Sequence, residues 1–442
     1  MTAAQTRELD KYAIDTLKIP GAALMRRASR HIAEACLELL GADGGAVAVF
    51  CGAGNNGGDG IGAAAYLLRA GVSARVFLIG DRERLSPDSA EMARRLEEYG
   101  GAVELFTAAE AALYLRRCHL IIDAIFGTGL SRAVEGDALA AVRLINDSGL
   151  RVVAADIPSG VDADTGGILG DAVRADVTVT FTALKPGHFL TPGGAAAGET
   201  RLCGIGIPRS VVEDVPSLVS AVEAGDITLP RRAPDTHKYD YGDALIIAGS
   251  VGFTGAPALA ARAATRAGAG IVRLGVPEAI YGIVAGKCSG EIVFPISGSV
   301  RGVRDEISAR GARADAVLIG PGLGDAAIAR ELAEGALLSL KCPVVLDADG
   351  INALEGHIDI LDAARAPVIL TPHDGEFRRI AGGDALIHGR LSAARRFAVE
   401  HGCVLILKGY RTITALPDGS AYINTTGSPA LAKGGTGDIL AG

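Results

Sequence analysis

The chain has 442 residues, a formal net charge of −8 at pH 7, seven cysteines and no tryptophan. The negative charge, with no basic stretch that alternates with aromatic residues, argues against a nucleic-acid-binding surface. No uncharged apolar run reaches the roughly 18 residues of a membrane helix and no Cys-x-x-Cys pair occurs, so we expect a cytoplasmic protein without a disulfide framework or zinc site.

The first half of the sequence alternates strand-like and helix-like patterns. Two helical patterns, over 6–17 and 22–40, come before this alternation and are separated by Pro20-Gly21. The predicted strands are 46–51, 74–79, 120–124, 151–155 and 177–181, and the predicted helices are 60–70, 88–99 and 137–148. This rhythm, in a chain rich in Ala, Val, Ile and Leu, predicts a parallel, doubly wound sheet.

A connection between about Ile207 and Tyr241, rich in proline and mixed charge, separates this series from a second one. The second series has predicted strands at 244–248, 271–275, 316–319, 344–347, 368–370 and 404–407, predicted helices at 256–267, 326–339 and 392–401, and a hairpin at Asp418-Gly419. The length of the chain also favours two domains. We predict two different three-layer αβα domains, over residues 1–215 and 225–442.

The first glycine-rich loop, Gly52 to Gly60, follows a predicted strand and precedes a predicted helix. An open α/β sheet places its ligand crevice at such a loop. The loop differs from the usual dinucleotide fingerprint, because Asn55, Asn56 and Asp59 add oxygen ligands and side-chain donors to the glycines. A structural glycine turn is the alternative, but it would not need these three polar side chains together.

Two more predicted strands lead into a loop through an aspartate. Asp123 precedes the loop 127–132, and Asp156 precedes Ser159. Carboxylates at the C-terminal ends of adjacent parallel strands should converge on one crevice, where the glycines and Arg132 of loop 127–132 suit a phosphate. Either aspartate alone could equally be a helix cap or a turn former.

The motifs Gly54-Asn-Asn-Gly-Gly-Asp-Gly60, Asp123-Ala-Ile-Phe-Gly-Thr-Gly129 and Asp156-Ile-Pro-Ser-Gly160 together resemble the NAD(P)H-hydrate epimerase domain, over about residues 1–215. The resemblance implies a Rossmann-like fold that interconverts the R and S hydrates at C6 of the dihydronicotinamide ring. It implies a potassium ion held by Asn56, Asp123 and Ser159, and Asp156 as the acid/base group. The implied contacts to the hydrated cofactor are Asn55, Asn56, Gly57, Gly58, Asp59, Gly127, Thr128, Gly129, Leu130, Ser131, Arg132, Ala133 and Asp156.

The second half also carries polar or glycine-rich loops at the ends of its predicted strands. These loops are 249–257, 320–324, 347–354, 371–377 and 408–412. His373 and Glu376 form a His-x-x-Glu pair, but no second histidine lies at zinc-ligand spacing, so a polar loop that contacts a ligand is predicted instead. Lys408 and the residues after it supply cationic and backbone donors of the kind that a nucleotide phosphate requires, although Lys408 alone could equally be a solvated surface lysine.

The stretch from Lys433 to Gly442 places glycines at 434, 435 and 437 before Asp438. A glycine-rich turn at a helix start stabilises an anion, and the Asp438 carboxylate could take a proton from a hydroxyl that is being phosphorylated. Judged alone, the stretch could also be an ordinary glycine turn with a capping aspartate.

In their order along the chain, these loops resemble the ribokinase-like fold and, within it, the nucleotide-dependent NAD(P)H-hydrate dehydratase. The resemblance implies that ADP, or ATP in some members, phosphorylates the C6 hydroxyl of the S-hydrate with the help of magnesium, after which phosphate leaves. Asp438 would be the base. The implied hydrate contacts are Ala256, Gly322, His373 and Asp438, and the implied nucleotide contacts are Lys408, Gly409, Tyr410, Arg411, Thr412 and Gly437. Family members continue past this motif, so we expect the second domain to be truncated at its C-terminus.

The sequence therefore predicts a bifunctional cofactor-repair enzyme that acts on the hydrates NADHX and NADPHX, uses ADP, and forms a homo-oligomer. Two alternatives remain open at this point. A ribokinase-like kinase for a small alcohol would release a stable phosphorylated product. A non-catalytic dinucleotide-binding protein would bind its ligand without turnover.

Overall fold

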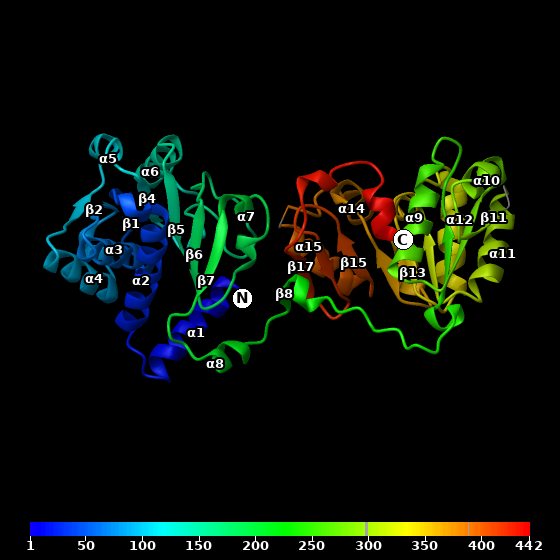
Figure 1. The fold of residues 1–442 in the computed structure, drawn as a ribbon, viewed down its shortest axis with the longest axis horizontal. Coiled ribbons are helices and arrows are strands. Elements are labelled where there is room, and N and C mark those ends of the chain that lie inside the picture. The colour runs from blue at the N-terminus through cyan, green and yellow to red at the C-terminus, as the bar shows by residue number, and fades with distance from the viewer. Residues whose placement is uncertain (297–298, 388) are drawn as a thin grey trace. The chain divides into compact units, whose positions relative to one another are not determined.

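The computed structural model describes residues 1–296, 299–387 and 389–442. The chain divides into two compact units, Met1–Ser217 and Leu218–Gly442, each with its own sheet (Figure 1). Of the helices in the described ranges, not one combines the length and the apolarity that a membrane crossing requires. Both units are α/β with largely parallel sheets, which confirms the predicted fold class.

The sheet of the first unit has seven parallel strands in the order β3-β2-β1-β4-β5-β6-β7. Its strands are β1 Ala46–Gly52, β2 Ser73–Ile79, β3 Val103–Leu105, β4 Leu120–Ala124, β5 Arg151–Ala155, β6 Val177–Phe181 and β7 Glu199–Cys203. The chain starts at β1, winds to the β3 edge and then returns to the other side of β1 through β4. The strand order therefore reverses between β1 and β4, and a doubly wound sheet opens its ligand crevice at this reversal.

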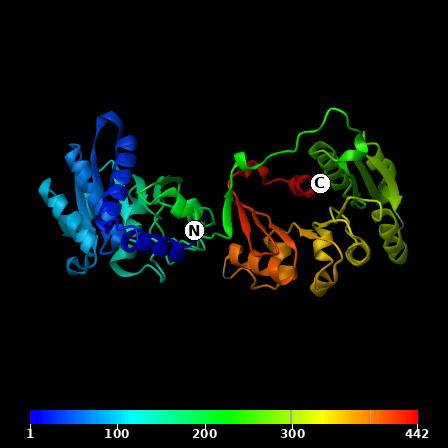
Figure 2. The ribbon, with the colours of Figure 1, turned by 90° about the horizontal axis from the view of Figure 1, so that it is seen from below.

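Helices cover both faces of this sheet (Figures 1 and 2). They are α1 Ala3–Asp15, α2 Gly21–Leu40, α3 Asn55–Arg69, α4 Pro87–Glu98, α5 Ala108–Leu115, α6 Gly136–Asp147, α7 Gly193–Ala196 and α8 Arg209–Glu213. Because side chains alternate along a strand, Val49 of β1 packs with α2, α3 and α4, whereas the next residue, Phe50, packs with α5 and α6. Helix α3 approaches β1 closely, since a Cβ at Gly57 would lie 1.8 Å from the carbonyl oxygen of Gly52.

The second unit has a ten-stranded sheet in the order β11-β10-β9-β12-β13-β14-β15-β16-β17-β8. Its strands are β8 Val219–Val222, β9 Asp243–Ile247, β10 Ile271–Pro277, β11 Ile292–Ile296, β12 Ala316–Ile319, β13 Val344–Leu346, β14 Val368–Leu370, β15 Val404–Leu407, β16 Ile413–Ala415 and β17 Ala421–Asn424. All neighbours are parallel except for the β15–β16 and β16–β17 pairs. Strand β8 lies in the stretch that the sequence treats as a plain connection, and it pairs with β17 at the sheet edge.

The helices of the second unit also lie on both faces of its sheet. They are α9 Gly255–Ala267, α10 Glu278–Ala285, α11 Val300–Gly311, α12 Ala326–Ser339, α13 Asp349–Asn352, α14 Asp374–Ala381, α15 Arg390–Glu400 and α16 Thr436–Ala441. Helices α9 and α10 share a core with Ile246 and Ala248, while α11 and α12 pack on the opposite face beside Ile247. Helix α16 lies against α9 (Figure 1). The strand order reverses between β9 and β12, so the loops after these strands border the expected ligand crevice.

Candidate active sites

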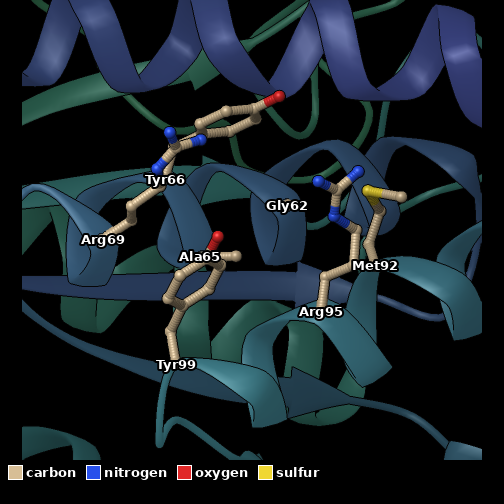
Figure 3. A pocket seen from close by; sticks show the side chains of 7 residues that line it. All are labelled: Gly62, Ala65, Tyr66, Arg69, Met92, Arg95 and Tyr99. Carbon is tan, nitrogen blue, oxygen red and sulfur yellow. The ribbon is translucent and has the colours of Figure 1, made fainter.

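A cavity of about 590 Å³ opens at the carboxyl ends of the strands in the first unit. It is lined by the loop from β1 into α3, by the loop after β4, by Asp156 after β5, by Lys185 after β6, and by one face of α1. A second, much smaller pocket of about 10 Å³ lies between α3 and α4, where Tyr66, Arg69, Arg95 and Tyr99 surround it (Figure 3). That space holds no more than a water molecule, so the large cavity is the candidate site.

The predicted cofactor loop after β1 divides into two groups of residues. Asn55, Asn56 and Asp59 line the cavity. Gly57 and Gly58 are buried and do not line the cavity. Their lack of a side chain lets α3 pack closely against β1 and against Met25 of α2. Contacts of these two glycines with the cofactor remain a prediction.

The predicted phosphate loop after β4 also contains residues that line the cavity and residues that do not. Gly127, Thr128, Gly129 and Leu130 line the cavity, and the Thr128 carbonyl accepts a hydrogen bond from Arg7 Nη1 of α1 at 3.3 Å. Ser131, Arg132 and Ala133 are exposed and are not among the cavity-lining residues. Their contact with a cofactor phosphate likewise remains a prediction.

Asp156 is held by a buried lysine that the sequence analysis did not single out. Lys185 Nζ donates to Asp156 Oδ1 at 2.6 Å and to Thr180 Oγ1 at 2.9 Å, and the Lys185 side chain is 0% exposed. Burial opposes ionisation of Asp156, but the charge and hydrogen bond of Lys185 outweigh it and hold the pKa of Asp156 below its usual value. Asp156 also has φ of +63°, a left-handed conformation that non-glycine residues rarely adopt and that is common at functional sites.

His188 holds the backbone of Asp156 through a hydrogen bond to its carbonyl oxygen. Its Nδ1 accepts a hydrogen bond from the Lys185 backbone N–H at 3.0 Å, so its Nε2–H donates to the Asp156 carbonyl oxygen at 2.8 Å. Burial, together with the nearby Lys185 charge, lowers the pKa of His188 to about 4. The imidazole is therefore neutral near pH 7 and serves to orient Asp156.

Among the described residues, four further aspartates line the same cavity, and burial raises the pKa of two of them, Asp59 and Asp10. Burial raises the pKa of Asp59 well above its usual value, and the charges of Asp156 and Asp10 add to this effect. Burial raises the pKa of Asp10 to about 6, against an opposing contribution from Lys185. The cavity thus combines one lysine-paired carboxylate, Asp156, with two carboxyl groups that keep their protons to a higher pH.

Of the three predicted potassium ligands, Asn56 lines the cavity, and Asp123 and Ser159 contact each other. Ser159 donates to the fully buried Asp123 carboxylate through its Oγ at 2.6 Å and its backbone N at 2.7 Å. Ser159 Oγ also accepts from the Phe126 backbone N–H at 2.8 Å. A Cβ at Gly127, the next residue, would lie 3.0 Å from Asn56 Oδ1. The loop after β4 therefore contacts the Asp123–Ser159 pair through Phe126 and lies next to Asn56 at Gly127.

The second unit builds its site around Lys408. Lys408 Nζ donates to Asp347 Oδ1 at 2.8 Å and lies 3.8 Å from Glu376 Oε2. Thr371 Oγ1 also donates to Asp347 Oδ1, at 2.6 Å. The Lys408 side chain is only 19% exposed, so its interpretation as a solvated surface lysine is wrong.

Asp438 faces this buried ion pair from α16. Burial raises the pKa of Asp438, and the Asp347 charge adds to the increase while Lys408 opposes it. A Cβ at Gly437 would lie 3.7 Å from Lys408 Nζ. Gly435, at the start of α16, has φ of +90°, which explains why a glycine precedes the helix. The helix continues to Ala441, whose side chain packs on the α9 core, so Asp438 lies on an ordered helix.

The other predicted hydrate contacts of the second unit lie at the start of α9, in the loop after β12 and at the start of α14. A Cβ at Gly322 would lie 3.2 Å from the Cβ of Ala256, so the structure brings these two residues together at the strand reversal. His373 is 56% exposed, and its Nδ1 accepts from the backbone N–H groups of Gly375 and Glu376 at the start of α14.

The nucleotide loop after β15 is held in place by a residue absent from the predicted set. Arg390 donates to the carbonyl oxygens of Leu407 at 3.1 Å and of Lys408 at 2.7 Å. It also pairs with Asp374 at 2.9 Å. In that loop, Gly409 and Tyr410 are exposed while Arg411 and Thr412 are half-buried.

Comparisons with known proteins agree with this two-site arrangement. Residues 244–442 match the family described as NAD(P)H-hydrate dehydratase, and residues 21–187 match the family described as YjeF-related protein N-terminus. Two relatives named bifunctional NAD(P)H-hydrate repair enzyme Nnr, from Salinibacter ruber and Moorella thermoacetica, are 38% and 37% identical over 100% of this chain and 86% of their own lengths. A crystal structure of the ADP/ATP-dependent NAD(P)H-hydrate dehydratase from Bacillus subtilis with ATP/Mg²⁺ is 35% identical, with a TM-score of 0.41, over 48% of this chain and 74% of that one. The chain belongs to the family of bifunctional NAD(P)H-hydrate repair enzymes, which join an epimerase domain to a dehydratase domain.

Proposed function

We propose that the first unit interconverts the R and S hydrates of NADH and NADPH at C6, and that the second unit dehydrates the S-hydrate with ADP to give AMP and phosphate. The observation that carries the first half of this proposal is the lysine-held Asp156 in a cavity of about 590 Å³. The second half rests on Asp438 beside the Asp347–Lys408 pair. The two reactions belong together, because epimerisation supplies the isomer that the dehydratase consumes.

In the epimerase, C6 of the hydrate carries a hydroxyl next to the ring nitrogen. The nitrogen lone pair assists departure of the hydroxyl, and water then adds to the resulting iminium carbon from the other face. Asp156 exchanges a proton with the C6 oxygen during these steps. Lys185 and His188 hold Asp156 in position, while the cofactor-binding contacts are those of residues 55–59 and 127–133.

The residues at Asn56, Asp123 and Ser159 fit a potassium ion. Their side chains offer oxygen atoms, as a hard cation prefers. Asp123 is completely buried, and in the described ranges no lysine or arginine pairs with it. Burial raises the pKa of Asp123 to about 6 despite the hydrogen bonds from Ser159. When bound, the ion would neutralise the Asp123 carboxylate and fix the loop after β4 through Asn56 and Ser159.

Potassium binding should therefore depend on pH. The ion binds the ionised form of Asp123, whose pKa is about 6, so binding is present above that pH and is lost as the pH falls through it. We expect potassium chloride to raise Tm more than choline chloride does at pH 8, and the difference to vanish near pH 5 or in Asp123→Asn. Asp137→Asn, at an exposed position of α6, is the matched control. A potassium-specific shift that persists in Asp123→Asn would contradict the assignment.

In the dehydratase, Asp438 takes the proton of the C6 hydroxyl as the hydroxyl attacks the terminal phosphate of the nucleotide. Phosphorylation converts a poor leaving group into a good one, and the ring nitrogen then assists departure of phosphate. Residues 408–412 and Gly437 bind the nucleotide, while Ala256, Gly322 and His373 contact the hydrate. Magnesium bound to the nucleotide would supply positive charge to the phosphates. The protein positions the reactants, and Lys408 restrains the negative charge of Asp347 next to Asp438.

We further propose that residues 1–215 and 225–442 are the two functional domains and that the protein is a cytoplasmic homo-oligomer. The division of the structure near residue 217 supports the domain limits. Light scattering of the purified chain, and separate expression of each half, would test these points.

The direct test supplies mixed R and S hydrates with ADP and magnesium. We expect complete recovery of the absorbance of the reduced nicotinamide, with release of phosphate and AMP. A small-alcohol kinase would instead accumulate a stable phosphorylated product, and a non-catalytic binding protein would give no turnover. Consumption of only the S isomer, with no more than spontaneous conversion of R, would refute the epimerase half.

A further inference from the structure

Helix α1 forms one wall of the epimerase cavity. Thr6, Asp10 and Ile14 follow one another at intervals of four residues, so they share one face of the helix, and all three line the cavity. Leu9 and Ala13, at three and seven residues after Thr6, lie on the adjoining side of the helix and are buried. Asp10 therefore faces the same space as Asp156, although 146 positions separate them in the sequence.

The start of α1 is fixed to the loop that carries Asp156. The Ala3 backbone N–H donates to Asp164 Oδ1 at 2.7 Å. The Ala3 side chain packs with Ile157, which directly follows Asp156, and with Val161 in the same loop. These contacts hold Asp10 and Asp156 in a defined arrangement, as two groups that act on one substrate atom require.

Asp10 and Asp156 differ in their partners. Asp156 accepts hydrogen bonds from Lys185 and Thr180. Within the part of the chain that the structure describes, the Asp10 carboxyl group has neither a hydrogen bond nor an ion pair with a side chain or the backbone. A carboxyl group without such a partner, on a cavity wall, is free to bond to the substrate.

We propose that Asp10 is the second acid–base residue of the epimerase. This inference rests on the proposed role of Asp156. In the direction from R to S, the Asp10 carboxyl group gives its proton to the C6 hydroxyl, the C6–O bond breaks, and the ring nitrogen lone pair forms the C6=N bond. Water then adds to C6 from the opposite face, its proton passes to the Asp156 carboxylate, and the nitrogen lone pair is restored. Exchange with solvent returns the two carboxyl groups to their starting protonation.

The charged surroundings of Asp10 suit a proton donor. Asp59 of α3, and Asp156 and Lys185 from the loops after β5 and β6, interact with it through their charges. The other charged residues that line the cavity are Arg7, Asp81, Arg84 and Asp88. Burial raises the pKa of Asp10 to about 6, with Asp156 adding to the increase and Lys185 opposing it. Because the protonated form donates, the rate should fall as the pH rises through about 6.

The test measures kcat and KM on pure R-hydrate without ADP, by chromatographic separation of the isomers, with the spontaneous rate subtracted. We expect Asp10→Asn to lower kcat about 100-fold or more, to change KM little, and to abolish the fall of rate above about pH 6. Asp10→Glu should keep that fall at a reduced kcat. Asp15→Asn, exposed on the same helix, should behave as the wild type.

A purely structural role for Asp10 predicts a different pattern. If Asp10→Asn retains most of its kcat, or loses activity while the pH profile keeps its shape, the proposal is overturned. If the wild type converts R no faster than the spontaneous reaction, the proposed epimerase function fails instead. Equal thermal unfolding of Asp10→Asn and wild type shows that the comparison concerns folded proteins.

Discussion

Asp156→Asn is expected to lower kcat for conversion of pure R-hydrate by about 10²–10⁴-fold, the range that loss of an acid–base group usually produces. The amide keeps the size of the side chain but cannot accept a proton in the reaction. It also leaves the ammonium of Lys185, which is 0% exposed, without a counter-charge. Part of the effect could thus arise from stability, since breaking a buried ion pair costs about 3–5 kcal/mol.

A second variant separates these two effects. Lys185→Met combined with Asp156→Asn removes both members of the pair and leaves no buried charge unpaired. We expect the double variant to regain thermal stability but not epimerase activity. Dehydration of pure S-hydrate by the same samples is the internal control, because it takes place in the other unit. Epimerase activity that returns together with stability would show that Asp156 only maintains the fold.

The interior of both sheets could be predicted from the sequence, but their edges could not. Every predicted strand is present. These strands could be recognised in the sequence because interior strands of a parallel sheet are continuous apolar runs. The four strands that the sequence analysis missed, β3, β7, β8 and β11, are the four edge strands. Strands β3 and β8 are short and β7 carries polar side chains, while β11 contains Pro295, which has no backbone N–H to donate. For β8, pairing with β17 depends on residues about 200 positions away, a contact that no local pattern contains.

The candidate sites show the same division between local and distant information. Asp123 and Asp156 could be predicted because each is next to the end of an interior strand. Lys185 was missed because it reaches Asp156 from the loop after the neighbouring strand, and nothing in its own segment indicates that its charge is buried. Asp10 was missed because helix α1 returns to the cavity only in the folded chain. Such residues are recognised by what they face and not by their spacing.

Asp438→Asn is expected to lower the rate of S-hydrate dehydration by about 10²–10⁴-fold with magnesium and ADP present. The change removes the proposed base but leaves Lys408, its partner Asp347 and the loop 408–412 in place. Nucleotide binding, measured by calorimetry, should therefore persist. In the wild type, the base must be ionised and its pKa is raised by burial, so the rate should increase with pH until Asp438 has lost its proton.

The controls for this prediction come from the chain itself. Asp235→Asn, at an exposed position between the two series of strands, should dehydrate the S-hydrate at the wild-type rate. Conversion of R to S by Asp438→Asn should also be normal, because that reaction uses the Asp156 cavity. Loss of nucleotide binding together with activity would place Asp438 in binding and not in proton transfer. Full dehydration by Asp438→Asn would contradict the assignment of Asp438 as the base.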